Sequence, residues 1–191
     1  MLENNLGPYI HIGLPVLNIV EAKEWYRDIF GFKIIHEPSI DVEGKTIHIS
    51  FLKKGKLELE FYELTEEEKK DYHIRKNGYI DHLAMKVKNI DKATELLVKN
   101  SAIKLDGANG VGVEKLKSQM FRGIYGEKLL IVESQDPPMD NFDLAFIGIA
   151  YSNKEKTINF YRQFRFEFLN DLMDAQTFFM KFKNIVLKFF F

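Results

Sequence analysis

The chain has 191 residues and no cysteine, and its 27 Lys and Arg residues nearly balance its 28 Asp and Glu residues, for a net charge of −1. This balance provides no positive field to hold a phosphate backbone, so nucleic acid is excluded as an expected partner. Disulfides, thiolate metal sites and cysteine nucleophiles are excluded as well. Because the sequence shows neither a signal-like N-terminus nor a long apolar run, we expect no membrane partner and a cytoplasmic location.

The first part of the chain predicts a βαβββ unit within residues 1–70. A strand over 9–16 runs into a helix that Asn18 caps and Gly31 ends, with apolar positions three and four residues apart between them. Strand-like alternation then follows three times, at 32–36, 46–52 and 56–62. Aromatic residues at helical spacing are expected in the core, namely Trp25, Tyr26, Phe160 and Tyr161.

Two further copies of this pattern follow, within residues 78–136 and 142–191. Each copy again joins a strand to a helix through an asparagine cap, Asn89 in the second and Asn153 in the third. The charged stretch 65–78 is interpreted as the connection between the first two copies, in the form of a solvated linker or a short surface helix. The apolar last strand of the third copy would be a hazardous free edge, so we expect it to be covered.

The three copies align at two positions, one that opens the first strand and one that lies on the last strand. The opening positions are His11, His82 and Phe146, and the closing positions, each nine residues after a phenylalanine, are Glu60, Leu130 and Lys188. Because a unit of this size seldom buries its own apolar face, repeated units are expected to stack on one another. The copies therefore carry the pairs His/Glu, His/Leu and Phe/Lys at the same two places.

Four segments resemble the vicinal oxygen chelate superfamily, which includes glyoxalase I, bleomycin resistance proteins and extradiol dioxygenases. They are HIGLPVLNIVEAKEWYRDIFGF, FLKKGKLELEFYEL, DHLAMKVKNIDKA and FRGIYGEKLLIVE. The resemblance implies an α+β fold of tandem βαβββ modules, in which two modules form a cupped eight-strand sheet around one site. We expect the first two modules to form one glyoxalase-like domain. The third, degenerate module is expected to pair with its equivalent in a homodimer, or else to flank the cup as a lid.

The same resemblance implies that a divalent metal ion, such as Zn, Ni, Co, Mn or Fe, is held by His11, Glu60 and His82. Leu130 occupies the fourth ligand position. Two imidazoles and one carboxylate form a recognised open metal site, so three protein ligands are chemically sufficient. Glu60 is then the candidate for the catalytic base. Glu133, three residues after Leu130, is expected on the opposite face of its strand, because strand side chains alternate.

Three residues are candidates for the pocket around this site: Glu58, His48 and Leu130. Glu58 shares the face of Glu60 one pleat repeat earlier, and it is the alternative ligand if the strand register is shifted by two residues. His48 lies on a strand whose inner face would line the same cup. There it is either a donor to the substrate or an ordinary surface residue.

The predicted function is that of a glyoxalase-like lyase or isomerase acting on a small, oxygen-chelating substrate. A metal-free protein that binds a small molecule, as in the bleomycin resistance branch, is the alternative that Leu130 favours. The paired imidazoles His11 and His82 favour a metal. A ring-cleaving dioxygenase fits less well, because that branch takes its carboxylate from the later module, where this chain has Leu130.

Overall fold

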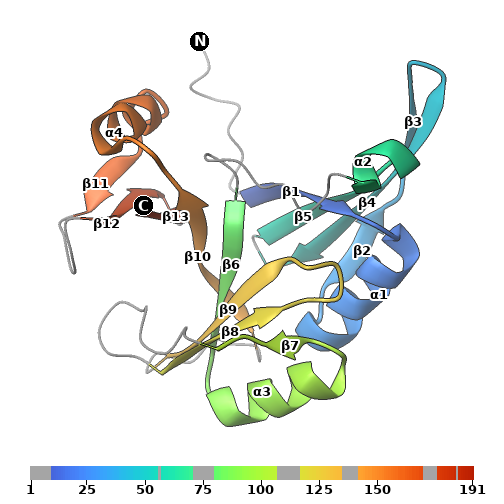
Figure 1. Cartoon of the computed structure of the whole chain (residues 1–191), viewed down its shortest axis with the longest axis horizontal. Helices are drawn as coiled ribbons and strands as arrows, with labels where there is room; N and C mark the ends of the chain where they lie inside the picture. Colours follow the sequence, from blue (N-terminus) through green and yellow to red (C-terminus); the bar gives the residue numbers. More distant parts are fainter. Residues whose placement is uncertain are drawn as a thin grey trace. The chain divides into compact units, whose positions relative to one another are not determined.

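The computed structural model describes residues 10–55, 57–70, 80–106, 117–134, 142–169, 176–183 and 185–191, with the backbone alone at residues 10 and 11 (Figure 1). It divides into two compact units, Met1–Ile74 and Arg75–Phe191. Within these described ranges, each helix is too short or too polar to cross a membrane.

In the first unit the described elements are β1 (Ile10–Val16), α1 (Ile19–Phe30), β2 (Lys33–His36), β3 (Ser39–Val42), β4 (Lys45–Lys54), β5 (Leu57–Glu63) and α2 (Glu66–Lys70). Its strands are joined in the order β1-β5-β4-β2, with β1 parallel to β5. The strand β3, which the sequence pattern did not indicate, forms a hairpin with β4. The helix α2 buries no side chain, as expected of a surface helix, and residues 71–78 of the predicted connection lie outside the described ranges.

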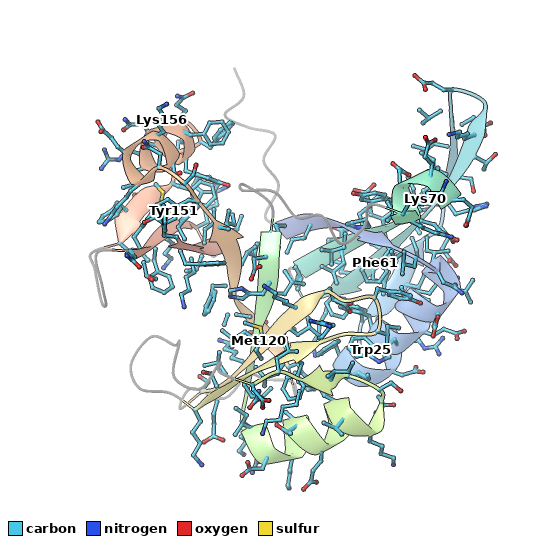
Figure 2. All side chains as sticks on the ribbon, in the orientation of Figure 1. Trp25, Phe61, Lys70, Met120, Tyr151 and Lys156 are labelled. Atoms are coloured by element: carbon cyan, nitrogen blue, oxygen red, sulfur yellow. The ribbon has the colours of Figure 1, made fainter. Side chains whose placement is uncertain are left out.

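The helix α1 packs on one face of this sheet. The rings of Tyr26 on α1 and Phe61 on β5 have centroids 4.9 Å apart, and Leu59 is buried on the same face (Phe61 is labelled in Figure 2). The intervening β5 residues Glu58 and Glu60 are half-buried. Because side chains alternate along a strand, these two carboxylates lie on the face opposite α1.

In the second unit the described elements are β6 (Ile80–Val87), α3 (Ile90–Lys99), β7 (Ile103–Lys104), β8 (Ser118–Arg122), β9 (Lys128–Glu133), β10 (Asp143–Ala150), α4 (Lys154–Arg162), β11 (Glu167–Leu169), β12 (Thr177–Phe182) and β13 (Ile185–Phe190). The strands form one eight-stranded sheet in the order β11-β12-β13-β10-β6-β9-β8-β7. The strands β6 and β10, which open the second and third modules, pair antiparallel at its centre. In Figure 1, α3 lies beside the β7–β9 half and α4 beside the β11–β13 half.

The predicted α+β fold is confirmed. The sequence predicted one sheet from the first two modules, whereas the described strands of the second module pair with those of the third. Among the described residues, the strands of 1–70 form one sheet and the strands of 78–136 belong to the other. The prediction gave the third module an accessory role because Phe146 and Lys188 are not metal ligands. Sheet pairing, however, uses the backbone groups at a strand edge, whatever the ligand chemistry of the side chains. The homodimer through the third module stays a prediction; within the chain, the first strand of that module, β10, pairs with β6.

The helices α1, α3 and α4 all begin in the same way. Asn18, Asn89 and Asn153 are their N-caps, with φ of −145°, −143° and −145°, and each side chain accepts a hydrogen bond from a backbone N–H group of the first turn. The helix α1 ends at Gly31, whose φ of 73° lies in the left-handed region that glycine favours. The predicted caps are therefore confirmed in all three modules.

Aromatic side chains fill the third module. Phe178 and Phe189 stack with centroids 4.8 Å apart, and β13 lies between β12 and β10, so the predicted covering of the last strand is confirmed. Tyr26 is buried as predicted, but the prediction for Phe160 is wrong, because 53 % of this residue is exposed. The helix α4 rests on the sheet through Tyr161, whose ring lies 4.9 Å from that of Phe189, and the preceding residue faces solvent.

Candidate functional site

The face of the first sheet opposite α1 carries two of the predicted site residues, Glu58 and Glu60 of β5. In the register of β1 and β5, His11 lies opposite Glu58, and Gly13 lies opposite Glu60. On the other side of β5, Phe51 of β4 lies opposite Glu60. The two marked positions of this module therefore lie on neighbouring strands, offset by one pleat repeat.

The carboxylate of Glu60 adjoins a position that has no side chain. A Cβ atom added at Gly13 would lie 3.9 Å from Oε2 of Glu60 and 4.0 Å from the ring of Tyr62. Gly13 is exposed, whereas Glu60 and Tyr62 are half-buried. On β4, Phe51 stacks on His36 with ring centroids 6.1 Å apart. Glu60 thus lies between an exposed backbone position and an aromatic pair.

The first sheet offers a partial metal site. Among the side chains that the structure describes, no group of three or more His, Asp and Glu residues could hold a metal ion. The side chain of His11 is outside that described set, and the register places its backbone opposite Glu58. Imidazole and carboxylate suit a borderline or hard divalent ion, so the chemistry of this donor set fits a metal. With one imidazole, the set remains short of the two that the sequence predicted.

His48 lies away from this face. It is exposed, on the part of β4 that pairs with β3, and its Nδ1 is 3.0 Å from Oγ of Ser39, its register partner. Its exposure agrees with the alternative of an ordinary surface residue, and the contact with the substrate stays a prediction. The hairpin of β3 and β4 explains this exposure, because it extends β4 beyond the four-strand core of the sheet.

His82 lies on β6 in the second unit and is 6 % exposed. Its Nδ1 is 3.0 Å from Oδ2 of Asp81, and its Nε2 has no hydrogen-bond partner in the described part of the chain. The ring stacks on Phe190 and meets Phe146 edge-on, with centroids 5.6 and 5.9 Å away. It also covers Gly148, where an added Cβ would lie 2.2 Å from Cε1. A buried imidazole that has one nitrogen bound to a carboxylate and the other without a partner can act as a metal ligand or as a hydrogen-bond acceptor.

The other aligned positions of the second unit supply no metal donor. Leu130 is 1 % exposed and belongs to an apolar cluster with Ala84, Val132, Phe146 and Phe179. Lys188 is buried, with its Nζ 5.5 Å from the centre of the Phe146 ring. An ammonium group repels a metal cation, and leucine and phenylalanine have no ligand atoms. The four aligned positions of this sheet therefore do not fit a divalent ion.

The structure brings His11 and Glu60 into one sheet and places His82 in another. The set of three ligands therefore stays a prediction. Glu133 accepts a hydrogen bond from the N–H of Ile90 at the start of α3, 3.0 Å away. This contact confirms that Glu133 lies on the helix-covered face of its sheet and does not replace the missing acid.

Sequence reasoning missed Asp81, Gly13 and Gly148. The two glycines each lie two residues after an opening position, His11 and Phe146, and that repeated spacing could have marked them. Asp81 carries no such signal, since the other two copies have apolar residues at its position. Its role depends on the tertiary contacts with its neighbours.

The carboxylate of Asp81 interacts with two basic side chains. Burial raises its pKa, but hydrogen bonds from His82 and from Lys128, whose Nζ is 2.8 Å from Oδ1, outweigh burial and lower the pKa to about 2. The ionised form therefore stabilises the fold above the unfolded-state pKa of about 3.9, and this contribution is lost as the pH falls towards 2.

In Asp81→Asn we expect this part of the acid dependence to disappear. Between about pH 5 and pH 2, the free energy of unfolding should fall more steeply in the unchanged protein than in the variant, as measured by urea denaturation at each pH. Asp143→Asn is the matched control, because Asp143 pairs with Lys86 in an exposed ion pair. The control should keep the wild-type slope, and equal slopes for all three proteins would contradict the prediction.

Comparison with protein families gives one match over more than half of the chain. Residues 10–113 match the family model described as the Glyoxalase/Bleomycin resistance protein/Dioxygenase superfamily. The chain is also 24 % identical over 124 residues to the uncharacterized protein YqjC of Bacillus subtilis (strain 168). This match covers 61 % of this chain and 87 % of that protein.

Solved structures share the fold at low sequence identity. Glyoxalase I from Zea mays superposes with a TM-score of 0.71 at 16 % identity, covering 96 % of this chain and 66 % of that one. A glyoxalase family protein from Bacillus cereus superposes with a TM-score of 0.53 at 15 % identity, and the match covers 70 % of this chain and 97 % of that one. A glyoxalase family protein from Enterococcus faecalis superposes with a TM-score of 0.52 at 21 % identity, and the match covers 68 % of this chain and 98 % of that one. The chain thus spans 66 % of the length of the maize enzyme, and the likeness concerns the fold.

Proposed function

Because the chain belongs to the Glyoxalase/Bleomycin resistance protein/Dioxygenase superfamily, we propose that it is a divalent-metal lyase or isomerase of the glyoxalase type. Its substrate is a small molecule with two neighbouring oxygens. The observation that carries this proposal is the row of donors on the first sheet. There β5 presents Glu58 and Glu60 on the face opposite α1, and β1 places His11 opposite Glu58.

In this proposal His11 and Glu60 hold the ion, which is Zn, Ni, Co, Mn or Fe. When bound, the ion supplies Lewis-acid polarisation of the substrate oxygens. Glu60 accepts the proton that leaves the substrate and returns it to the product, because its carboxylate is half-buried and adjoins the exposed Gly13. Glu58 lies opposite Lys53, a cross-strand neighbour of opposite charge, so we assign proton transfer to Glu60.

Metal content tests this proposal. The purified protein, stripped with a chelator and incubated with each ion in turn, is expected to regain bound metal, measured by inductively coupled plasma mass spectrometry. His11→Ala and Glu60→Gln should lose it. Glu63→Gln is the matched control on the same strand, since that carboxylate accepts a hydrogen bond from the N–H of Ile19, and it should keep the metal. Less than about a tenth of an equivalent in the reconstituted wild type would exclude the metal-dependent activity.

His82 is the predicted third donor, and the same assay decides its role. The Nε2 atom of His82 has no hydrogen-bond partner among the described residues, so it is suited to binding a metal ion. Lys188 and Phe146, at the aligned positions of the third module, are not suited to it, because one is a cation and the other an aromatic ring. If His82 binds the ion, His82→Ala should lose the metal as His11→Ala does. Retention of metal by His82→Ala would remove His82 from the ligand set and leave His11 and Glu60 in it.

A metal-free small-molecule-binding function is the second candidate, and the second unit favours it. The buried Lys188 and the imidazole of His82 both contact the ring of Phe146, so a cation, a hydrogen-bonding nitrogen and an aromatic surface lie together. Such groups recognise an anionic aromatic molecule. Ring cleavage is not proposed, because Leu130 takes the place of the carboxylate in the later module.

A further inference from the structure

The strand β2 pairs with β4 through an irregular register. Ile34 lies opposite Leu52. The next pair joins His36 to Phe51, so Ile35 is left as an extra residue in β2. An extra residue of this kind is a β-bulge, which re-aims the side chains that follow it. In a regular strand Ile35 would lie opposite Phe51 and His36 would share the face of Ile34. The bulge places the imidazole there instead.

The ring contacts show that His36 shares the face of Glu60. The rings of His36 and Phe51 are stacked, with 22° between their planes. Phe51 is the register partner of Glu60, whose side chain lies on the face opposite α1. In exchange, 47 % of Ile35 is exposed to solvent. A bulge that exposes an isoleucine and turns an imidazole towards a carboxylate breaks a local packing rule, and such breaks are typical of functional sites.

The described pairs of the other two modules have no such bulge. Phe121 and Phe179 occupy the place of Phe51 in the repeat. Lys104 lies opposite Phe121, and Leu169 lies opposite Phe179, each in a register without a shift. The module fold itself therefore does not require the bulge. The module that has it is also the one with a carboxylate at its closing position.

The register places four residues in one row across the first sheet. The row begins at Gly13 on β1 and continues through Glu60 on β5 and Phe51 on β4 to His36 on β2. Neighbouring strands lie about 4.8 Å apart, so the backbone of His36 is about 10 Å from that of Glu60. Gly13 and His36 are exposed at the two ends, and the two residues between them are half-buried. A molecule that lies along the row contacts a carboxylate, a phenyl ring and an imidazole in turn.

The charge of this face changes sign from β5 to β2. The two carboxylates, Glu58 and Glu60, lie on β5. In the neighbouring row, Glu58 lies opposite Lys53 on β4, and Lys53 lies opposite Lys33 on β2. An anionic group is repelled by the carboxylates of β5 and attracted by these lysines. Charge therefore directs an anionic group of a bound molecule to the end of the row where His36 lies.

We propose that His36 is a specificity-determining residue of the site, and that it binds an anionic group at the far end of the substrate. The imidazole donates a hydrogen bond to that group, and the middle of the substrate packs on Phe51. This inference rests on the proposed function, because it takes Glu60 as the end where the proton is transferred. It narrows the substrate class to small molecules with two neighbouring oxygens at one end and an anionic group at the other.

Two hydroxamates serve as probes for this inference. Benzohydroxamate has two neighbouring oxygens, which chelate a metal ion, on a flat ring, and 4-carboxybenzohydroxamate adds a carboxylate at the opposite end of that ring. Both are titrated by calorimetry into the protein reconstituted with the ion that it regains. The carboxylate should tighten binding by about tenfold, the usual effect of a hydrogen bond to a charged group.

Three variants separate a binding role of His36 from a structural one. His36→Phe keeps a ring against Phe51 but removes the donor, so it should lose the tenfold preference and bind benzohydroxamate as the wild type does. His36→Arg should keep the preference, because a guanidinium both stacks on a ring and donates to a carboxylate. Lys45→Met is the matched control, since it removes an exposed cation from the part of β4 that pairs with β3, and it should also keep the preference.

The outcomes distinguish a failure of this inference from a failure of the proposed function. Equal affinity of the metal-loaded wild type for the two hydroxamates, or a preference that His36→Phe retains, would overturn the inference and leave the proposed function standing. Loss of the preference in His36→Arg or in Lys45→Met would overturn it too, because neither change removes a donor from the row. A wild type that regains no metal would overturn the proposed function, and with it this inference.

Discussion

Gly148→Ala is expected to destabilise the second unit by about 1–3 kcal/mol, the usual cost of forcing an extra group into a packed site. The new Cβ atom would lie between 2.2 and 2.5 Å from three atoms of the His82 ring. That ring is stacked on Phe190 and meets Phe146 edge-on, so a shift of the ring would disturb both contacts. Urea denaturation followed by circular dichroism measures the loss.

A double-mutant cycle supplies the control for this prediction. In a His82→Ala background the clash is absent, so the added methyl group of Gly148→Ala should cost little. The difference between the two costs is the interaction energy of the pair. Equal destabilisation in both backgrounds would show that the alanine disturbs the backbone of β10 and not the imidazole. The close approach of ring and backbone would then have no energetic importance.

Leu130→Glu is expected to have the larger effect, about 3–5 kcal/mol at pH 8, which is typical of a buried charge left without a partner. Leu130 is 1 % exposed and packs among the apolar residues Ala84, Val132, Phe146 and Phe179. The change restores the carboxylate that the aligned position carries in the first module, so it also tests whether this position can serve a metal. Urea denaturation gives the loss of stability, and metal analysis gives the binding.

The destabilisation by Leu130→Glu should depend on pH. Burial disfavours the ionised form, so the folded-state pKa of the new carboxyl group should lie above its unfolded value of about 4.3. The cost is therefore largest above the folded-state pKa and shrinks as the pH falls through it. Leu130→Met, which conserves volume, should cost less than about 1.5 kcal/mol at any pH. A Leu130→Glu protein that is as stable as wild type and binds an ion through His82 would overturn the structural role given to Leu130.

Local structure was predictable because its causes are local. Each asparagine cap, Asn18, Asn89 and Asn153, is fixed by its own side chain and the next few N–H groups. The alignment of the closing positions was also predictable. Glu60 on β5 lies opposite Gly13 of β1, and Leu130 on β9 lies opposite Ala84 of β6, which is the equivalent position in the repeat. His11 and Glu60 lie on β1 and β5, which pair with each other.

The choice of partner module was not predictable from the marked residues. The third module was interpreted as degenerate because Phe146 and Lys188 cannot bind a metal. In the structure, however, Phe146 packs against the ring of His82, and Lys188 lies over Phe146. These contacts form between strands far apart in the sequence. Ligand chemistry in one copy contains no information about which backbone edge that copy pairs with. The prediction that Phe160 lies in the core was wrong for a related reason. A helical period does not indicate how much of a helix the sheet covers.

The pairing of β6 with β10 has a consequence for substitutions. His82 lies opposite Gly148 and Ala84 lies opposite Phe146, so each strand sets a small residue against a ring of the other strand. The two rings meet edge-on, with centroids 5.9 Å apart. A larger side chain at either small position would therefore press on one ring and, through it, on the other.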